Sequence, residues 1–109
     1  MKKALRPGGI ICTQGECIWL HLDLISKVMA DAGNLFPIVD YSKTSIPTYP
    51  SGTIGFIMCS TGDRKLNTPA HFPDAEMQAQ LRYYNKDVHT AAFVLPQFAE
   101  NKIGPHRKN

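Results

Sequence analysis

The sequence lacks any apolar run of the roughly 18 residues that a membrane-spanning helix needs. The opening MKKALRPGG is basic, but Thr13, Gln14 and Glu16 interrupt the apolar stretch that a secretory signal would require. We therefore expect no membrane association and a cytoplasmic location. The three cysteines are then expected to be free thiols in a reducing compartment rather than a disulfide framework.

Basic residues interleaved with aromatic ones are also lacking. The net charge of +3 rests mostly on the two ends, with Lys2, Lys3 and Arg6 at one and Arg107 and Lys108 at the other. A nucleic-acid groove needs a basic cluster with aromatic side chains between its members. We therefore expect no nucleic-acid partner.

Familiar catalytic and metal-binding motifs are absent as well. There is no nucleophile elbow, no glycine-rich phosphate loop and no paired-carboxylate motif. Cys12, Cys17 and His21 have the spacing C-x4-C-x3-H, but a structural zinc site needs four ligands and no fourth lies nearby. Cys12 also falls in an apolar strand, where we expect its side chain to face the core. We expect no metal site.

The elements that are present follow the order strand, helix, strand, strand, helix. Apolar residues recur at helical spacing from Ile18 to Ala32, and Gly33 and Pro37 follow as stop signals. The segment Thr53–Cys59 is apolar on both faces, which predicts a strand covered on both sides. The predicted strands are Ile10–Thr13, Ile38–Ser45 and Thr53–Ser60, and the predicted helices are Glu16–Ala32, Asp74–Tyr84 and a turn or two after Pro96.

This order predicts an α/β fold in a single domain. A parallel strand-helix-strand step followed by a return strand is one way in which open α/β sheets end. The first strand is expected to be central, because it is apolar and leads into a helix. Three strands leave its outer edge open, so we expect the chain to be the last part of a larger sheet.

Two polar residues stand where a ligand is expected. Gln14 follows the first strand, and ligands of open α/β sheets bind beyond the carboxyl ends of the strands. Tyr49 lies between Pro47 and Pro50, and Tyr49-Pro50-Ser51-Gly52 fits a type I turn. An amide and a phenol without full charge suit the positioning of an amine or alcohol. Glu16 is explained equally well by the helix dipole, and Trp19 by packing.

Three long motifs resemble the C-terminal portion of the spermidine synthase family, of the eukaryotic kind. They are QGECIWLHLDLI, LFPIVDYSKTSIPTYPSGTIGF and RYYNKDVHTAAFVLPQFA. The resemblance runs nearly from residue 4 to residue 100 and weakens between Thr61 and Ala79. The resemblance implies a methyltransferase-like Rossmann sheet, preceded in the family by a small β domain. On this reading residues 1–109 are the C-terminal part of one incomplete catalytic domain, with no second domain.

The resemblance also implies an activity. The family transfers an aminopropyl group from decarboxylated S-adenosylmethionine to putrescine, giving spermidine and methylthioadenosine, without a metal or other cofactor. Gln14 and Tyr49 match the residues that help to hold the amine end of putrescine. The family's catalytic aspartate, its nucleoside-binding residues and much of its dimer interface lie upstream of this chain. We therefore expect the intact enzyme to be a homodimer and this chain alone to be inactive.

Alternatives remain open at this stage. The same motifs occur in related aminopropyltransferases such as spermine synthase and in putrescine N-methyltransferase. A third possibility is a short, non-catalytic protein that binds a full-length subunit, with the open edge of its first strand as the interaction surface.

Overall fold

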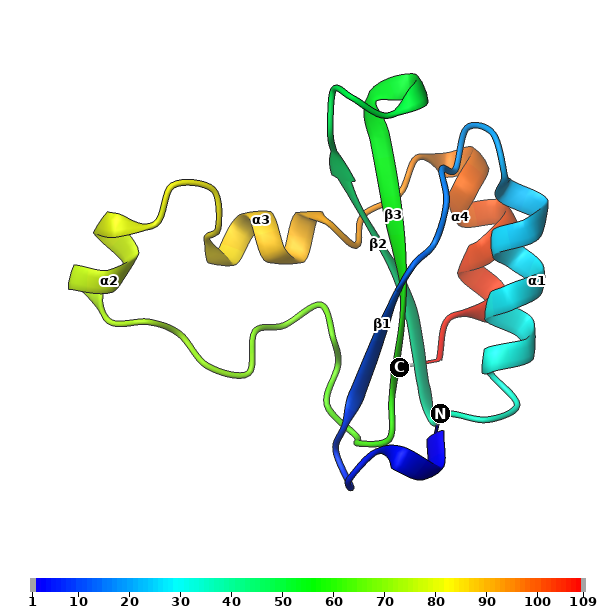
Figure 1. Cartoon of the computed structure of the whole chain (residues 1–109), viewed down its shortest axis with the longest axis horizontal. Coiled ribbons are helices and arrows are strands. Elements are labelled where there is room, and N and C mark those ends of the chain that lie inside the picture. Colours follow the sequence, from blue (N-terminus) through cyan, green and yellow to red (C-terminus); the bar gives the residue numbers. More distant parts are fainter. Residues whose placement is uncertain (1, 109) are drawn as a thin grey trace.

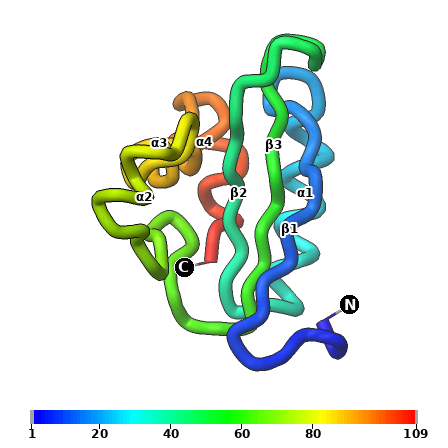
Figure 2. The backbone as a smooth tube through the Cα atoms, turned by 60° about the vertical axis from the view of Figure 1, so that its left-hand side comes forward, coloured from blue at the N-terminus to red at the C-terminus, as the bar shows by residue number. Residues whose placement is uncertain are grey.

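A three-stranded antiparallel sheet forms the centre of the computed structural model, which describes residues 2–108. Its strands are β1 (Ile10–Gln14), β2 (Ile38–Ser45) and β3 (Thr53–Ser60), in the spatial order β1-β3-β2. Both outer strands pair antiparallel to β3, so β1 and β2 run in the same direction with the return strand between them. Figure 2 shows this order plainly. The predicted strand-helix-strand-strand order is confirmed, and the bounds of β2 and β3 match the prediction.

The strand at the centre of this sheet is β3. Ile54, Ile57 and Cys59 are buried along it, as its apolar sequence predicts. In the sheet formed by the described residues β1 is an edge strand with one side open, and its central place in a larger sheet stays a prediction. The prediction for Cys12 is wrong, because Cys12 is exposed. Alternate residues of a strand face opposite sides, and Ile11, not Cys12, packs on the main core.

Helix α1 (Leu22–Ala32) begins six residues later than predicted. Glu16 has a φ of 58°, in the left-handed region, and the chain then turns through residues 17–21 before the helix starts. The backbone N–H groups of Leu20 and His21 both donate to the carbonyl of Cys17 in this turn. The helix does end at Ala32, although Gly33 has ordinary right-handed angles and not the left-handed ones common after a helix.

The main core lies between the sheet and two helices. Figure 1 shows α1 and α4 (Gln97–Ile103) on the same side of the sheet. Ile25 and Met29 of α1 and Ala99 and Ile103 of α4 are fully or almost fully buried there. Helical structure after Pro96 is therefore confirmed.

Two short helices lie on the other side of the sheet (Figure 1). They are α2 (Ala75–Gln80) and α3 (Lys86–Ala91). The prediction of one helix over Asp74–Tyr84 is wrong in extent, because Asp74 is the N-cap and the helix ends at Gln80. Helix α3 is not predicted. It begins at an Asn85 cap, whose side-chain oxygen accepts from the Val88 N–H at 2.7 Å.

The C-terminal residues lie against the outer edge of β2. Val39 and Lys108 exchange two backbone hydrogen bonds of 2.9 Å. Arg107 Nε lies 2.7 Å from Oδ1 of Asp40, a carboxylate with only 2% of its side chain exposed. Short 3-10 turns cover Lys2–Ala4, Pro50–Gly52 and Gly104–His106. Over residues 2–108, none of the helices is long and apolar enough to cross a bilayer.

Candidate functional site

The carboxyl end of β1 opens into a cavity of about 160 Å³. It lies where the segment after β1 meets the loop that joins β2 to β3. Gln14 and Tyr49, which the sequence singled out separately, both line it. The remaining lining residues are Glu16, Cys17, Leu20, His21, Pro50, Thr53 and Ile54.

The loop that carries Tyr49 is closed by its own backbone hydrogen bonds. The N–H of Tyr49 donates to the carbonyl of Ile46, and the N–H of Gly52 donates back to the carbonyl of Tyr49 at 2.9 Å. Ser51, the third residue of the turn, has φ 62° and ψ 3°, which is the signature of a type II turn. The predicted type I turn is therefore wrong. The loop nevertheless holds the Tyr49 side chain at the rim of the cavity, 39% exposed.

The loop around Tyr49 is tied to the segment after β1 by a side-chain contact. Cys17 Sγ and Ser51 Oγ are 2.8 Å apart, and Cys17 is only 6% exposed. The two walls of the cavity are thus joined directly, 34 residues apart in sequence. No pattern in the sequence indicates this pair, because neither residue type is selective for the other.

Two ionisable side chains of the cavity, Glu16 and His21, lie close to each other. Glu16 Oε2 lies 3.6 Å from His21 Nδ1, and both side chains are about half exposed. Glu16 is the carboxylate among the lining residues. It precedes the first residue of α1 by six positions, so the helix dipole does not explain it. A carboxylate beside an amide and a phenol can accept hydrogen bonds from an ammonium group.

The end of β1 is fixed from within the core by Tyr41. Its hydroxyl lies 3.0 Å from the carbonyl oxygens of both Gly15 and Glu16. Tyr41 is fully buried. Burial raises the pKa of the Tyr41 phenol above its ordinary value, and the nearby Cys17 and Glu16 add to the rise. The phenol is therefore neutral at physiological pH and donates its proton to the backbone. Sequence reasoning missed this contact because it depends on the strand register.

The residues of the C-x4-C-x3-H spacing, for which we expect no metal site, do not all line the cavity. Cys17 and His21 line the cavity, but Cys12 does not. Throughout residues 2–108 there is no group of three or more histidine, cysteine or acidic side chains arranged to hold a metal ion. Trp19, which precedes α1, contacts Phe98 of α4 with ring centroids 4.7 Å apart, so it packs at the surface beside the cavity.

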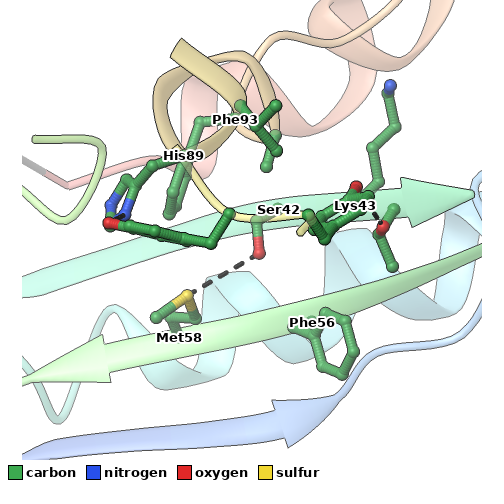
Figure 3. Close-up of a pocket in the computed structure, with 11 residues that line it drawn as sticks. Ser42, Lys43, Phe56, Met58, His89 and Phe93 are labelled. Atoms are coloured by element: carbon green, nitrogen blue, oxygen red, sulfur yellow. Dashed lines mark hydrogen bonds between the residues drawn. The ribbon is translucent and has the colours of Figure 1, made fainter. Parts of the chain in front are cut away.

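Larger cavities lie elsewhere. The one of about 400 Å³ has a carboxylate, Asp63, but also the cations Arg64 and Lys65 among its lining residues. One of about 240 Å³ lies between α3 and the face of the sheet opposite the main core (Figure 3). Phe56, Met58 and Phe93 line it, and the Ser42 hydroxyl points across it toward the sulfur of Met58 at 3.7 Å (Figure 3). No carboxylate lines it. Of the cavities beside α3 and at the end of β1, the smaller one at the end of β1 has the carboxylate that an ammonium group can pair with.

Fold and cavity define the class of protein to which the chain can be compared. The structure of spermidine synthase from Thermotoga maritima superimposes with a TM-score of 0.73 and 27% identity, over 94% of this chain and 36% of that one. A spermidine synthase in complex with the transition state analogue AdoDATO gives the same TM-score and identity, over 94% and 35%. The fold is thus the Rossmann-like, methyltransferase-type sheet found in spermidine synthases.

Sequence comparison gives the family. The model of the spermine/spermidine synthase domain matches residues 1–68. Spermidine synthase from Dictyostelium discoideum is 50% identical over 103 residues, 94% of this chain and 36% of that protein. Putrescine N-methyltransferase 2 from Nicotiana tabacum is 44% identical over 110 residues, 93% and 31% respectively. The chain belongs to the spermine/spermidine synthase family. It spans about a third of the length of these relatives.

Proposed function

We propose that this chain supplies the diamine-binding part of a spermidine synthase. The reaction transfers an aminopropyl group from decarboxylated S-adenosylmethionine to putrescine, giving spermidine and methylthioadenosine. Membership of the family supports this proposal, together with 50% identity to a protein named spermidine synthase.

One observation carries the proposal. Gln14 and Glu16, at the end of β1, and Tyr49, in the loop between β2 and β3, line a single cavity. Putrescine is a dication at neutral pH, because alkyl ammonium groups have pKa values near 10. The amide oxygen of Gln14 and the hydroxyl of Tyr49 accept hydrogen bonds from one amine end, and Glu16 supplies the opposite charge.

The chemical step needs positioning and the loss of a proton. The attacking nitrogen forms a bond to the aminopropyl carbon while the bond from that carbon to the sulfonium sulfur breaks and methylthioadenosine leaves. Holding the nitrogen in line with this carbon supplies much of the rate. The amine must also give up a proton to a base. No aspartate lines the cavity in the described part of the chain. Because the family resemblance implies a catalytic aspartate upstream of this chain, we expect the base to come from outside these residues and the chain alone to be inactive.

Putrescine N-methyltransferase is the second candidate. Its support is the 44% identity of the Nicotiana tabacum protein over 93% of this chain. That relative's name gives putrescine as its acceptor too, so the proposed roles of Gln14 and Tyr49 are the same in both cases. The two candidates differ in the group that is transferred.

The protein as it occurs in its own cells can decide between them. An antibody to the largely exposed segment 82–98 would capture it for assay with putrescine in EDTA. Decarboxylated S-adenosylmethionine and S-adenosylmethionine would be offered as alternative donors, with products identified by mass spectrometry. We expect spermidine from the first donor. N-methylputrescine from the second would favour the other candidate. No product from either, or a requirement for a metal, would contradict the proposal.

A further inference from the structure

The backbone after Gln14 turns at Glu16 in an unusual conformation, and two hydrogen bonds stabilise this turn. Glu16 has a φ of 58°, a conformation that non-glycine residues rarely adopt. Such a conformation persists only where the surroundings fix it. Its carbonyl oxygen receives two donors, the N–H of Gly55 at 2.8 Å and the hydroxyl of Tyr41 at 3.0 Å.

The Tyr41 hydroxyl reaches this point only because Gly55 leaves room for it. A Cβ atom at Gly55 would lie 1.7 Å from the hydroxyl oxygen of Tyr41. One at Gly15 would lie 2.8 Å from Cγ1 of Ile57 and 3.2 Å from Cε2 of Tyr41. Neither glycine has a positive φ, so backbone conformation alone does not require glycine at either position. Close approach of Tyr41 requires glycine at position 55, and close approach of Ile57 requires it at position 15.

The Tyr41 hydroxyl hydrogen-bonds to the backbone segment that carries two residues of the cavity, Gln14 and Glu16. Its proton is shared between the carbonyls of Gly15 and Glu16, each 3.0 Å away. The N–H of Gly15 is held in turn by the carbonyl of Gly55 at 2.7 Å. Gln14 and Glu16, on either side of Gly15, both line the cavity. Tyr41 itself does not line it and cannot touch a ligand there.

We propose that Tyr41 is a positioning residue for the diamine site: its hydroxyl sets the turn that aims Gln14 and Glu16 into the cavity. This inference rests on the proposed function of that cavity. It goes further in assigning a buried phenol, which contacts no substrate, a specific effect on binding of the diamine. The nucleoside co-substrate is expected to be insensitive to it.

The test uses a chimera in which this complete chain replaces the matching segment of the Dictyostelium discoideum spermidine synthase. Tyr41→Phe removes the hydroxyl and keeps the ring. We expect the KM for putrescine to rise by about threefold to tenfold, the effect of one lost hydrogen bond. The kcat and the KM for decarboxylated S-adenosylmethionine should change by less than about twofold. Tyr83→Phe is the matched control, because its hydroxyl bonds Thr44 away from this cavity.

The outcomes separate this inference from the function on which it rests. A parent chimera that folds but does not use putrescine contradicts the proposed function. An active chimera in which Tyr41→Phe leaves the KM for putrescine unchanged overturns the positioning role alone. Equal losses for both substrates would also overturn it, because they indicate a general structural effect.

A second measurement applies if Tyr41→Phe does not fold. Tyrosine labelled with ¹³C at Cζ reports the hydroxyl environment of Tyr41 in the unaltered chimera. Saturating putrescine should shift the Tyr41 Cζ signal and the Gly15 amide signal while leaving Tyr83 unchanged. If both reporters stay unmoved while putrescine binds, Tyr41 does not communicate with the site and the inference fails.

Discussion

At the scale of single residues, the site depends on two side chains held by different means. Tyr49 is placed by a small hydrogen-bonded loop at the rim, and Gln14 is placed by the last pairing of β1 with β3, opposite Phe56. Neither carries a charge. In the proposed function they select and orient the amine, while charge comes from Glu16.

Tyr49→Phe tests this division in the chimera described above. Loss of the hydroxyl should raise the KM for putrescine by about threefold to tenfold, since one hydrogen bond is removed. The KM for the nucleoside should hardly change. Steady-state kinetics with each substrate varied in turn measures both values. Parallel loss for both substrates would mean that Tyr49 is structural.

The pH dependence of stability is the second prediction at this scale. Burial raises the folded-state pKa of the Tyr41 phenol above its unfolded value of about 10. The folded protein therefore keeps a proton that the unfolded chain loses. The free energy of unfolding should be unaffected by Tyr41 below pH 10 and should fall as the pH rises above it. Denaturant unfolding between pH 8 and 11 measures this fall.

Cys59 provides the control for that experiment. Burial also raises the pKa of its thiol above the ordinary value of 9.0. The contribution of Cys59 to the free energy of unfolding therefore begins to fall at a lower pH than that of Tyr41. Tyr41→Phe should abolish the fall above pH 10 and keep the one that begins near pH 9. An unchanged profile in Tyr41→Phe would contradict the burial argument.

At the scale of elements, the short helices depend on their caps. The side chain of Asn85 accepts from the Val88 N–H and begins α3, just ahead of Phe93 in the smaller apolar cluster. Asn85→Ala should lower the free energy of unfolding by about 1 kcal/mol, as loss of an N-cap does. Hydrogen exchange should also accelerate in residues 86–92.

Asp74→Ala is the matched control for that change. Asp74 caps α2 in the same way, with a 2.9 Å bond from the Met77 N–H, but no residue of α2 is buried. Asp74→Ala should therefore accelerate hydrogen exchange within α2 and have little effect on the free energy of global unfolding. Equal losses in the free energy of unfolding from the two variants would show that the packing of Phe93 after α3 does not contribute to global stability.

Sequence patterns predict these elements unevenly, for physical reasons. The bounds of β2 and β3 could be predicted because both strands are largely buried, and β3 is apolar on both faces. Helix α1 begins late because the left-handed backbone at Glu16 interrupts a pattern whose Ile18 is nevertheless buried. Helix α3 has only six residues, too few for periodicity to reveal.

The candidate site shows the same limit. The place of Gln14 after a strand and the flanking prolines of Tyr49 predict both residues as site residues, and the family resemblance supports both. That they share one cavity required the structure. The support from Tyr41 requires the antiparallel register that places Gly55 across from Lys43, two residues after Tyr41 and on the same face of β2. Such contacts depend on pairing between distant segments, which local patterns do not contain.

At the scale of the whole molecule, the C-terminal tail is fixed by a partly buried ion pair. Arg107 lies 2.7 Å from Asp40 Oδ1 and 3.1 Å from Glu100 Oε2, and it donates to the carbonyl of Phe93. The tail thereby joins α4, the segment after α3, and β2. This contact holds the elements on both sides of the sheet together.

Arg107→Met tests the importance of that contact. It removes a cation beside a carboxylate that is 2% exposed, so we expect a loss of about 3–5 kcal/mol in the free energy of unfolding. Lys102→Met is the control, since its pair with Asp23 is exposed and should contribute about 1 kcal/mol or less. Similar small losses from both variants, measured by denaturant unfolding, would show that the tail is not anchored as described.

The central claim is that the cavity at the end of β1 binds a diamine. A crystal structure of the chimera, grown with putrescine and methylthioadenosine, tests it most directly. We predict density for putrescine with one nitrogen within hydrogen-bonding distance, directly or through one water, of Gln14 and Tyr49. Density for putrescine in the aromatic cavity beside α3, or an empty cavity at the end of β1 in an otherwise active enzyme, would contradict the account.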